Sequence, residues 1–255
     1  MRLFRIAPAI LLFGLVVGCA RVPANRASSV NKILVVTMTV RGQLEVNRLP
    51  SGNFYYVLLN LTDNIGDAGP APVVGPPWGN GFAAPSRDGE QGFVGFVRYS
   101  RDEGLGGLGV YTSQVGGELV NPVTLRSFTP IGPPDRSQTP QPGDSTISFQ
   151  LDLGRLPNAD KRFLQINLLA TDTLPLPADP PTAEHRWDAL GDGTQTGSLI
   201  NYLTLDTRQN RIITNSQQVS GGPQEIANDV RDRLGPTVDD PTLDIVDWTI
   251  QLRDP

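Results

Sequence analysis

Alternation of apolar and polar positions is the strongest pattern along the chain. Within residues 145–153, apolar side chains occupy every second position from Ile147 to Leu153, and Ser, Gln and Asp lie between them. Successive side chains of a strand point to opposite faces, so this spacing predicts a strand with one face toward water. Residues 244–252 repeat the pattern with Trp248 on the apolar side, where we expect it to lie in the core and the strand to close a sheet.

Further segments are rich in β-branched and aromatic residues and are bounded by Gly, Pro, Asn or Asp, as strands usually are. They are residues 32–40, 53–61, 93–100, 162–171 and 198–206, with shorter candidates at 43–47, 108–113, 118–127 and 211–216. Several are apolar on both faces. This property predicts strands in the centre of a two-layer fold.

Helical spacing occurs in one segment, residues 223–234, where Ile226, Val230 and Leu234 follow at intervals of four. Many strands, one short helix and no alternation of strands with helices predict an all-β protein. We expect an antiparallel β-sandwich of immunoglobulin-like or jelly-roll kind with long loops. A partly closed barrel is the alternative.

The first residues have the composition of an export signal. Arg2 and Arg5 precede an apolar run over residues 6–17, and a small residue stands before Cys19. The run is too short for a bilayer, which needs about 20 apolar residues in a helix. We therefore expect a signal peptide rather than a permanent membrane helix; the alternatives are a secretory signal cut elsewhere and an N-terminal segment of the core.

Residues 16–19, Val-Val-Gly-Cys, resemble the lipobox of bacterial lipoproteins. The resemblance implies that residues 1–18 are removed and that Cys19 becomes a lipidated N-terminus. Residues 19–31 would then be the lipidated cysteine with a flexible tether, and residues 32–255 a single domain. Because Ala20 follows the cysteine, the resemblance also implies the outer membrane of a cell envelope, if the source has two membranes.

Composition narrows the possible partners. The formal net charge is -5 at pH 7 and the basic residues are scattered singly, so we expect no nucleic acid as a partner. Cys19 is the only cysteine, which excludes a disulfide within the chain and a thiolate metal site. We expect no cofactor and no metal. The expected partners are the membrane, through the N-terminal lipid, and a glycan or an envelope protein.

Three segments are too long for ordinary hairpins, namely residues 62–92, 129–143 and 172–197. Structureless loops of this length are uncommon and are often functional. The first carries Trp78 and Phe82, and the third carries Trp187 and Asp188. Flat rings beside polar groups suit the binding of a sugar or a peptide, whereas burial of each ring beneath its own loop is the more common use of tryptophan.

Motifs for catalysis and metal binding are weak. Asp188 and Asp192, followed by Gly193, partly resemble an acidic calcium loop, but the spacing does not fit an EF-hand and Asp-Gly pairs commonly form turns. His185 is the only histidine, and we expect it to be exposed on a loop. No Gly-x-Ser-x-Gly motif accompanies it, so a serine hydrolase is not indicated.

Residues 54–57, Phe-Tyr-Tyr-Val, and the strand of Trp248 are similar to segments of DOMON-like and carbohydrate-module sandwiches found outside cells. We expect a non-enzymatic binding or structural role at the cell envelope. The alternative is a hydrolase of envelope or extracellular polysaccharide that uses carboxylates of residues 172–197, since such enzymes need two carboxyl groups about 5–9 Å apart.

Overall fold

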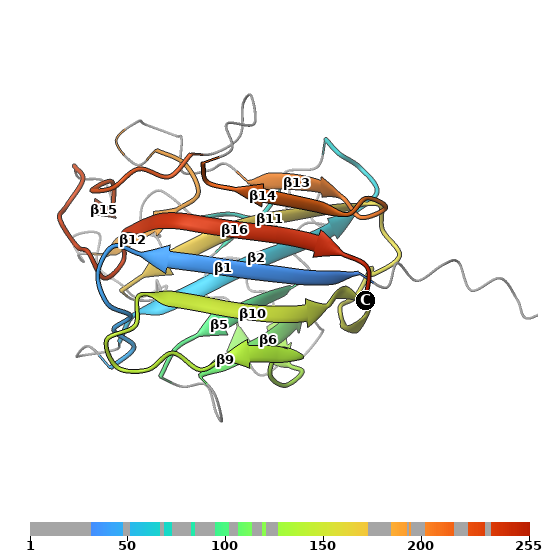
Figure 1. Cartoon of the computed structure of the whole chain (residues 1–255), viewed down its shortest axis with the longest axis horizontal. Helices are drawn as coiled ribbons and strands as arrows, with labels where there is room; N and C mark the ends of the chain where they lie inside the picture. Colours follow the sequence, from blue (N-terminus) through green and yellow to red (C-terminus); the bar gives the residue numbers. More distant parts are fainter. Residues whose placement is uncertain are drawn as a thin grey trace, which may run out of the picture.

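A computed structural model describes residues 32–47, 52–66, 69–72, 83–84, 95–101, 107–113, 119–120, 127–172, 185–192, 194, 202–216, 224–232 and 236–255. In these parts, the chain forms two large antiparallel sheets that pack face to face (Figure 1). The predicted all-β sandwich is confirmed.

The smaller sheet has five strands. Its order across the sheet is β14 (Arg211–Thr214), β16 (Ile245–Arg253), β1 (Ile33–Val40), β10 (Thr146–Asp152) and β9 (Arg136–Gln138). Along β1 and β10, buried and partly exposed residues alternate strictly, because only one face of these strands packs on the core. The period-two pattern of the sequence therefore results from the burial of one face of each strand.

The larger sheet has nine strands. Eight follow in the order β15 (Arg231–Asp232), β12 (Arg186–Ala189), β11 (Phe163–Thr171), β2 (Phe54–Thr62), β5 (Gly95–Tyr99), β6 (Leu108–Ser113), β8 (Ser127–Pro130) and β7 (Leu119–Val120). The ninth, β13 (Leu203–Asp206), pairs with the beginning of β11, whereas β12 pairs with its end. A separate pair consists of β3 (Ala71–Pro72) and β4 (Ala83–Ala84).

Apolar side chains of both sheets meet in the main core, to which Leu34, Leu59 and Ile250 belong. The opposite face of the larger sheet carries a second buried cluster. Its members are Phe54, Tyr56, Leu58, Phe96, Tyr111, Phe128, Leu169, Trp187 and Ala189. Because β2 contributes to both clusters, all of its residues are buried, as predicted for a central strand that is apolar on both faces.

Five local predictions are wrong. Residues 43–47 form no strand, β16 lies inside its sheet between β14 and β1, and β9 and β12 form within segments expected to be loops. The described part of the predicted helix, residues 224–232, contains a turn and β15 instead. Asn228 has a φ of 69° there, and its N–H donates to Asp244 Oδ2, so a tertiary contact replaces helical hydrogen bonds. The one helix in the described parts is the 3-10 turn Leu153–Arg155.

Strand pairing gives the sandwich two distinct ends. Ile33 pairs with Arg253 and Val40 pairs with Ile245, so the start of the domain and its C-terminus share one end (Figure 1). Lys32 Nζ donates there to Asp254 Oδ1 over 2.7 Å. We call this the Lys32 end. The opposite end, where Arg41 forms an ion pair with Asp244, is the Asp244 end.

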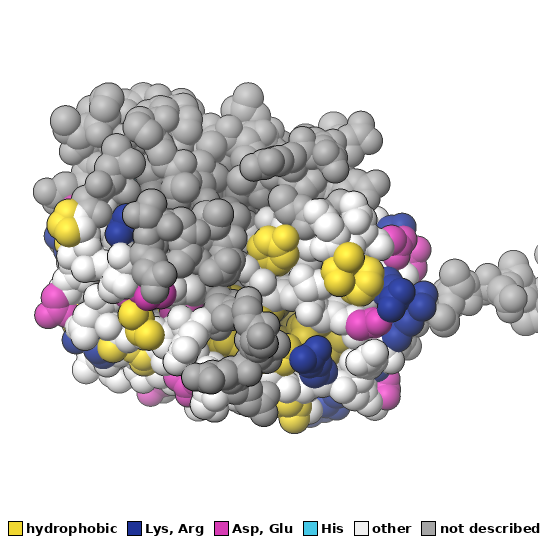
Figure 2. All heavy atoms as spheres, turned by 90° about the horizontal axis from the view of Figure 1, so that it is seen from above, with side chains coloured by type: hydrophobic (Ala, Val, Ile, Leu, Met, Phe, Trp, Pro, Cys, Tyr) yellow, Lys and Arg dark blue, Asp and Glu magenta, His cyan; other side chains and the backbone are white. Residues whose placement is uncertain are grey.

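On the face shown in Figure 2, basic and acidic side chains lie beside one another on the described surface. The exposed large apolar side chains of the described residues are Ile65, Ile212 and Ile226, and they come from separate segments of the chain. Among the helices of the described residues, none has the length and apolar character needed to cross a membrane.

Candidate functional site: a buried carboxylate cluster

Asp188 lies in β12, which pairs with the end of β11 so that Asp188 is opposite Ala170. Neighbouring side chains of a strand point to opposite faces. Trp187 therefore joins the second apolar cluster, while Asp188 shares the face of Ala170, which belongs to the core between the sheets. Regular strand geometry thus brings a carboxylate into the interior.

Glu225 and Asp229 reach the same place from the segment that precedes β15. Asn215 positions this segment, since its Oδ1 accepts from Glu225 N over 2.9 Å and its Nδ2 donates to Glu225 O over 3.4 Å. The left-handed backbone of Asn228 then turns the chain. These contacts place both acidic side chains beside Asp188.

The resulting group is compact and buried. One carboxylate oxygen from each of Asp188, Glu225 and Asp229 lies within 4.8 Å of the others. Glu225 is 4% exposed, and Asp188 and Asp229 are fully buried. We call these three residues the carboxylate cluster.

Backbone N–H groups hold some of the carboxylate oxygens. Asp188 accepts from Ala189 N over 2.8 Å and from Ile245 N over 2.7 Å, so both of its oxygens are used. Glu225 Oε1 accepts from Gly191 N over 2.9 Å. Glu225 Oε2 is buried and has no hydrogen-bond partner among the described residues.

A fourth carboxylate, that of Asp244, is fully buried and close enough for its charge to act on Asp188 and Glu225. Its Oδ2 accepts from Asn228 N over 2.9 Å and pairs with the Arg41 guanidinium, which raises the pKa of Arg41. Its Oδ1 is buried and has no hydrogen-bond partner in the described part of the chain.

Burial and mutual repulsion control the ionisation of the cluster. The pKa of Asp188 is raised well above its ordinary value, first by burial and then by the nearby charge of Asp229. Burial likewise raises the pKa of Glu225, and the charge of Asp188 adds to the effect. Carboxyl groups in such surroundings either keep protons or need a compensating cation.

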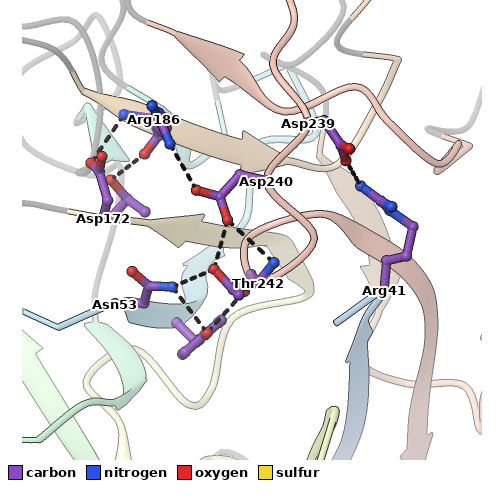
Figure 3. A network of polar contacts seen from close by, with 9 residues as sticks. Arg41, Asn53, Asp172, Arg186, Asp239, Asp240 and Thr242 are labelled. Carbon is purple, nitrogen blue, oxygen red and sulfur yellow. Dashed lines mark hydrogen bonds and ion pairs between the residues drawn. The ribbon is translucent and has the colours of Figure 1, made fainter. Parts of the chain in front are cut away.

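A second polar network fastens the loop before β16 to both sheets (Figure 3). Asp240 accepts from Arg186 Nη1 over 3.2 Å and from Thr242 Oγ1 over 2.7 Å, and Asn53 Nδ2 donates to Thr242 Oγ1 over 2.8 Å. Arg41 pairs with Asp239 in this loop as well as with Asp244. The loop that leads to Asp244 is therefore fixed by charged groups.

The predicted binding residues have mixed outcomes. Trp187 is 3% exposed and Asp188 is fully buried, and both lie in a strand, so neither is presented on the surface. His185 was expected to be exposed and is buried, so that prediction is wrong. Trp78, Phe82 and Cys19 lie outside the described residues.

The sequence pattern singles out Asp188 as a candidate ligand but groups it with Asp192, which is not its partner in the structure. Asp192 accepts from Thr194 N in a turn and is not part of the cluster, which contains Glu225 and Asp229 instead. The spacing in residues 223–234 predicts a helix for these two residues, and the alternation in residues 244–252 predicts a strand that begins at Asp244. No spacing rule connects acidic residues that come from three separate segments.

A surface hollow of about 450 Å³ is lined by residues 43–47, Tyr99 and residues 140–143, and it includes no member of the carboxylate cluster. Comparisons of the chain with protein-family models, curated proteins and solved structures found no match. The chemistry of the site therefore has to be argued from its own geometry.

Proposed function

We propose that the chain is an exported lipoprotein, anchored in a membrane of the cell envelope through lipidated Cys19, whose β-sandwich has a non-enzymatic binding or structural role. The observation that carries the proposal is the N-terminal sequence, in which a basic start, an apolar run and a lipobox-like Val-Val-Gly-Cys precede the domain. In a source with two membranes, we propose the outer membrane, because Ala20 follows the cysteine.

Anchoring at Cys19 has a geometric consequence. Residues 20–31 would join the lipid to Lys32 and would span up to about 40 Å at full extension. The Lys32 end would then face the membrane. The Asp244 end lies about 25 Å away along β1, at 3.3 Å per residue, and would face outward with the carboxylate cluster.

The burial and hydrogen bonding of acidic residues in 172–197 favour a binding or structural role over polysaccharide hydrolysis. Asp188 is buried and its two oxygens accept backbone hydrogen bonds, and Asp172 accepts from Arg186 N over 3.0 Å. A glycosidase needs an accessible pair of carboxyl groups on either side of the scissile bond. Asp188 and Asp172 instead accept hydrogen bonds from backbone N–H groups of the sandwich.

The anchor is tested with full-length chain expressed in a diderm bacterium and labelled with radioactive palmitate. We expect label in the wild-type protein and recovery in the membrane fraction, and we expect both to be lost in Cys19→Ser. The matched control is Ser28→Ala, which changes a hydroxyl in the proposed tether and should keep both. Equal labelling of wild type and Cys19→Ser, or no labelling of either, would refute the anchor.

The role is tested by presenting the purified full-length chain, in detergent, to an array of glycans and envelope polymers. Saturable binding without release of reducing ends would support a binding role. Multiple turnover of any polymer, at a rate proportional to protein concentration, would refute the non-enzymatic proposal. Deletion of the gene with a readout of envelope integrity tests the structural role if the array is negative.

A further inference from the structure

The carboxylate cluster concentrates negative charge inside the protein. Asp188, Glu225 and Asp229 bring one oxygen each within 4.8 Å, and buried Asp244 lies beside them. We propose that the carboxylate cluster is a calcium site that fastens the segment of residues 224–230 to the two sheets. This inference does not depend on the lipoprotein proposal, since a site of this kind would act in an anchored or a free protein.

The spacing of the oxygens suits calcium. Calcium binds oxygen ligands at about 2.3–2.6 Å, so two oxygens on one ion are separated by up to about 5 Å. The limit of 4.8 Å in the cluster falls within this range. Magnesium usually keeps several of its waters and is seldom held by a cage made of protein ligands alone, so a buried set of three carboxylates favours calcium. An all-oxygen donor set also disfavours zinc, which prefers nitrogen and sulfur.

Two oxygens without partners provide an independent indication of a ligand. Glu225 Oε2 belongs to a side chain that is 4% exposed, Asp244 Oδ1 belongs to one that is fully buried, and neither has a hydrogen-bond partner among the described residues. Buried polar atoms in native proteins are nearly always satisfied by protein, water or an ion. A cation in the cluster would supply the missing interaction to Glu225 directly and would be attracted by the nearby charge of Asp244.

Charge balance leads to the same conclusion. Within the described parts of the chain, neither Asp188 nor Glu225 takes part in an ion pair, and the guanidinium of Arg41 pairs with Asp244 and Asp239 instead. Unpaired buried carboxylates are strongly disfavoured unless a cation coordinates them. A divalent ion would compensate most of this charge without any further basic side chain.

The ion would have a structural effect. It would join Asp188 of β12 to the segment of Glu225 and Asp229, which is held by few regular backbone hydrogen bonds. Asp188 already accepts from Ile245 N at the start of β16. Calcium would therefore connect the larger sheet, the smaller sheet and the intervening segment at the Asp244 end.

The test uses the full-length chain in detergent, stripped with EGTA, with calcium chloride as the probe. Isothermal titration calorimetry should give saturable binding of one ion per chain. Thermal unfolding should shift upward by about 5–10 °C when free calcium reaches a hundred times Kd. Magnesium at equal concentration should give at least a tenfold weaker response.

Variants locate the site. Glu225→Gln keeps an oxygen that can accept from Gly191 N but removes the charge, so the protein should fold and calcium affinity should fall at least tenfold. Asp229→Asn should act in the same way and serves as a second variant. The matched control is Asp160→Asn, an exposed acid before β11 at the Lys32 end, which should bind calcium as the wild type does.

Three outcomes would overturn the proposal. One is a folded wild type with no heat of binding and no thermal shift up to about 10 mM calcium, a concentration that exceeds the Kd of weak extracellular sites. Another is an equal calcium response in Glu225→Gln and Asp160→Asn. A third is a magnesium response as large as that of calcium. The first result would mean that the buried carboxyl groups are balanced by shared protons.

Discussion

The buried carboxylate of Asp188 accepts a hydrogen bond over 2.7 Å from the backbone N–H of Ile245, and this contact joins the two sheets of the sandwich. Asp188 belongs to β12 of the larger sheet, and Ile245 is the first residue of β16 in the smaller one. Backbone hydrogen bonds between paired strands form within each sheet and not between β12 and β16. A side chain from one sheet therefore supplies the acceptor that the first N–H of the other needs.

Replacement of Asp188 should show how much its hydrogen bonds contribute to the free energy of unfolding. Asp188→Ala leaves the N–H groups of Ala189 and Ile245 buried without an acceptor, and we expect the free energy of unfolding to fall by about 2–4 kcal/mol. Asp188→Asn should cost less, because its amide oxygen can still accept and the buried charge is gone. Urea unfolding in the presence of EGTA measures both, and equal losses would contradict the argument.

Trp187 should act on stability rather than on ligand binding. Its side chain is 3% exposed and packs in the second apolar cluster, so Trp187→Ala should reduce the free energy of unfolding by about 3–5 kcal/mol. Trp187→Phe should retain more than half of that energy. Thermal and urea unfolding provide the measurement. A Trp187→Ala protein of unchanged stability would show that the ring is not part of the core.

Tyr55 should make the fold sensitive to alkali. Burial raises its pKa to about 12, and its hydroxyl donates to Thr242 O over 2.9 Å. An unfolded chain would release this proton near pH 10, so stability is full below pH 10 and falls as the pH rises toward 12, by up to about 3 kcal/mol. Tyr55→Phe should have a smaller alkaline loss. Unfolding curves from pH 8 to pH 12 test this, and parallel curves would refute it.

Asp254 should contribute stability that disappears in acid. The hydrogen bond from Lys32, followed by that from Asn210, lowers the pKa of Asp254. The contribution is therefore present above the unfolded value near 3.9 and is lost as the pH falls through the lower folded value. The difference in Tm between wild type and Asp254→Asn should shrink as the pH is lowered from 6 to about 3. A constant difference would mean that the carboxylate charge has no role.

The long strands could be predicted because the burial of one face produces a regular alternation of apolar and polar residues. One face of β1, β10 and β16 packs on the core, so apolar residues recur with period two. Short strands such as β9 and β12 have too few residues to show a period. They form because they pair with the longer strands β10 and β11. The segment of residues 224–232 has helical spacing, but hydrogen bonds from Asn215 and Asp244 hold it in another shape.

Local sequence patterns were enough to predict an all-β chain, and they include the N-terminal pattern on which the export proposal rests, because both depend on residues close together in the chain. Tertiary contacts set the order of the strands and bring together Asp188, Glu225, Asp229 and Asp244. Four acidic residues from three segments become neighbours only when two sheets pack face to face. The free energy that buries them comes from apolar contacts elsewhere in the core, which no local pattern of charges records.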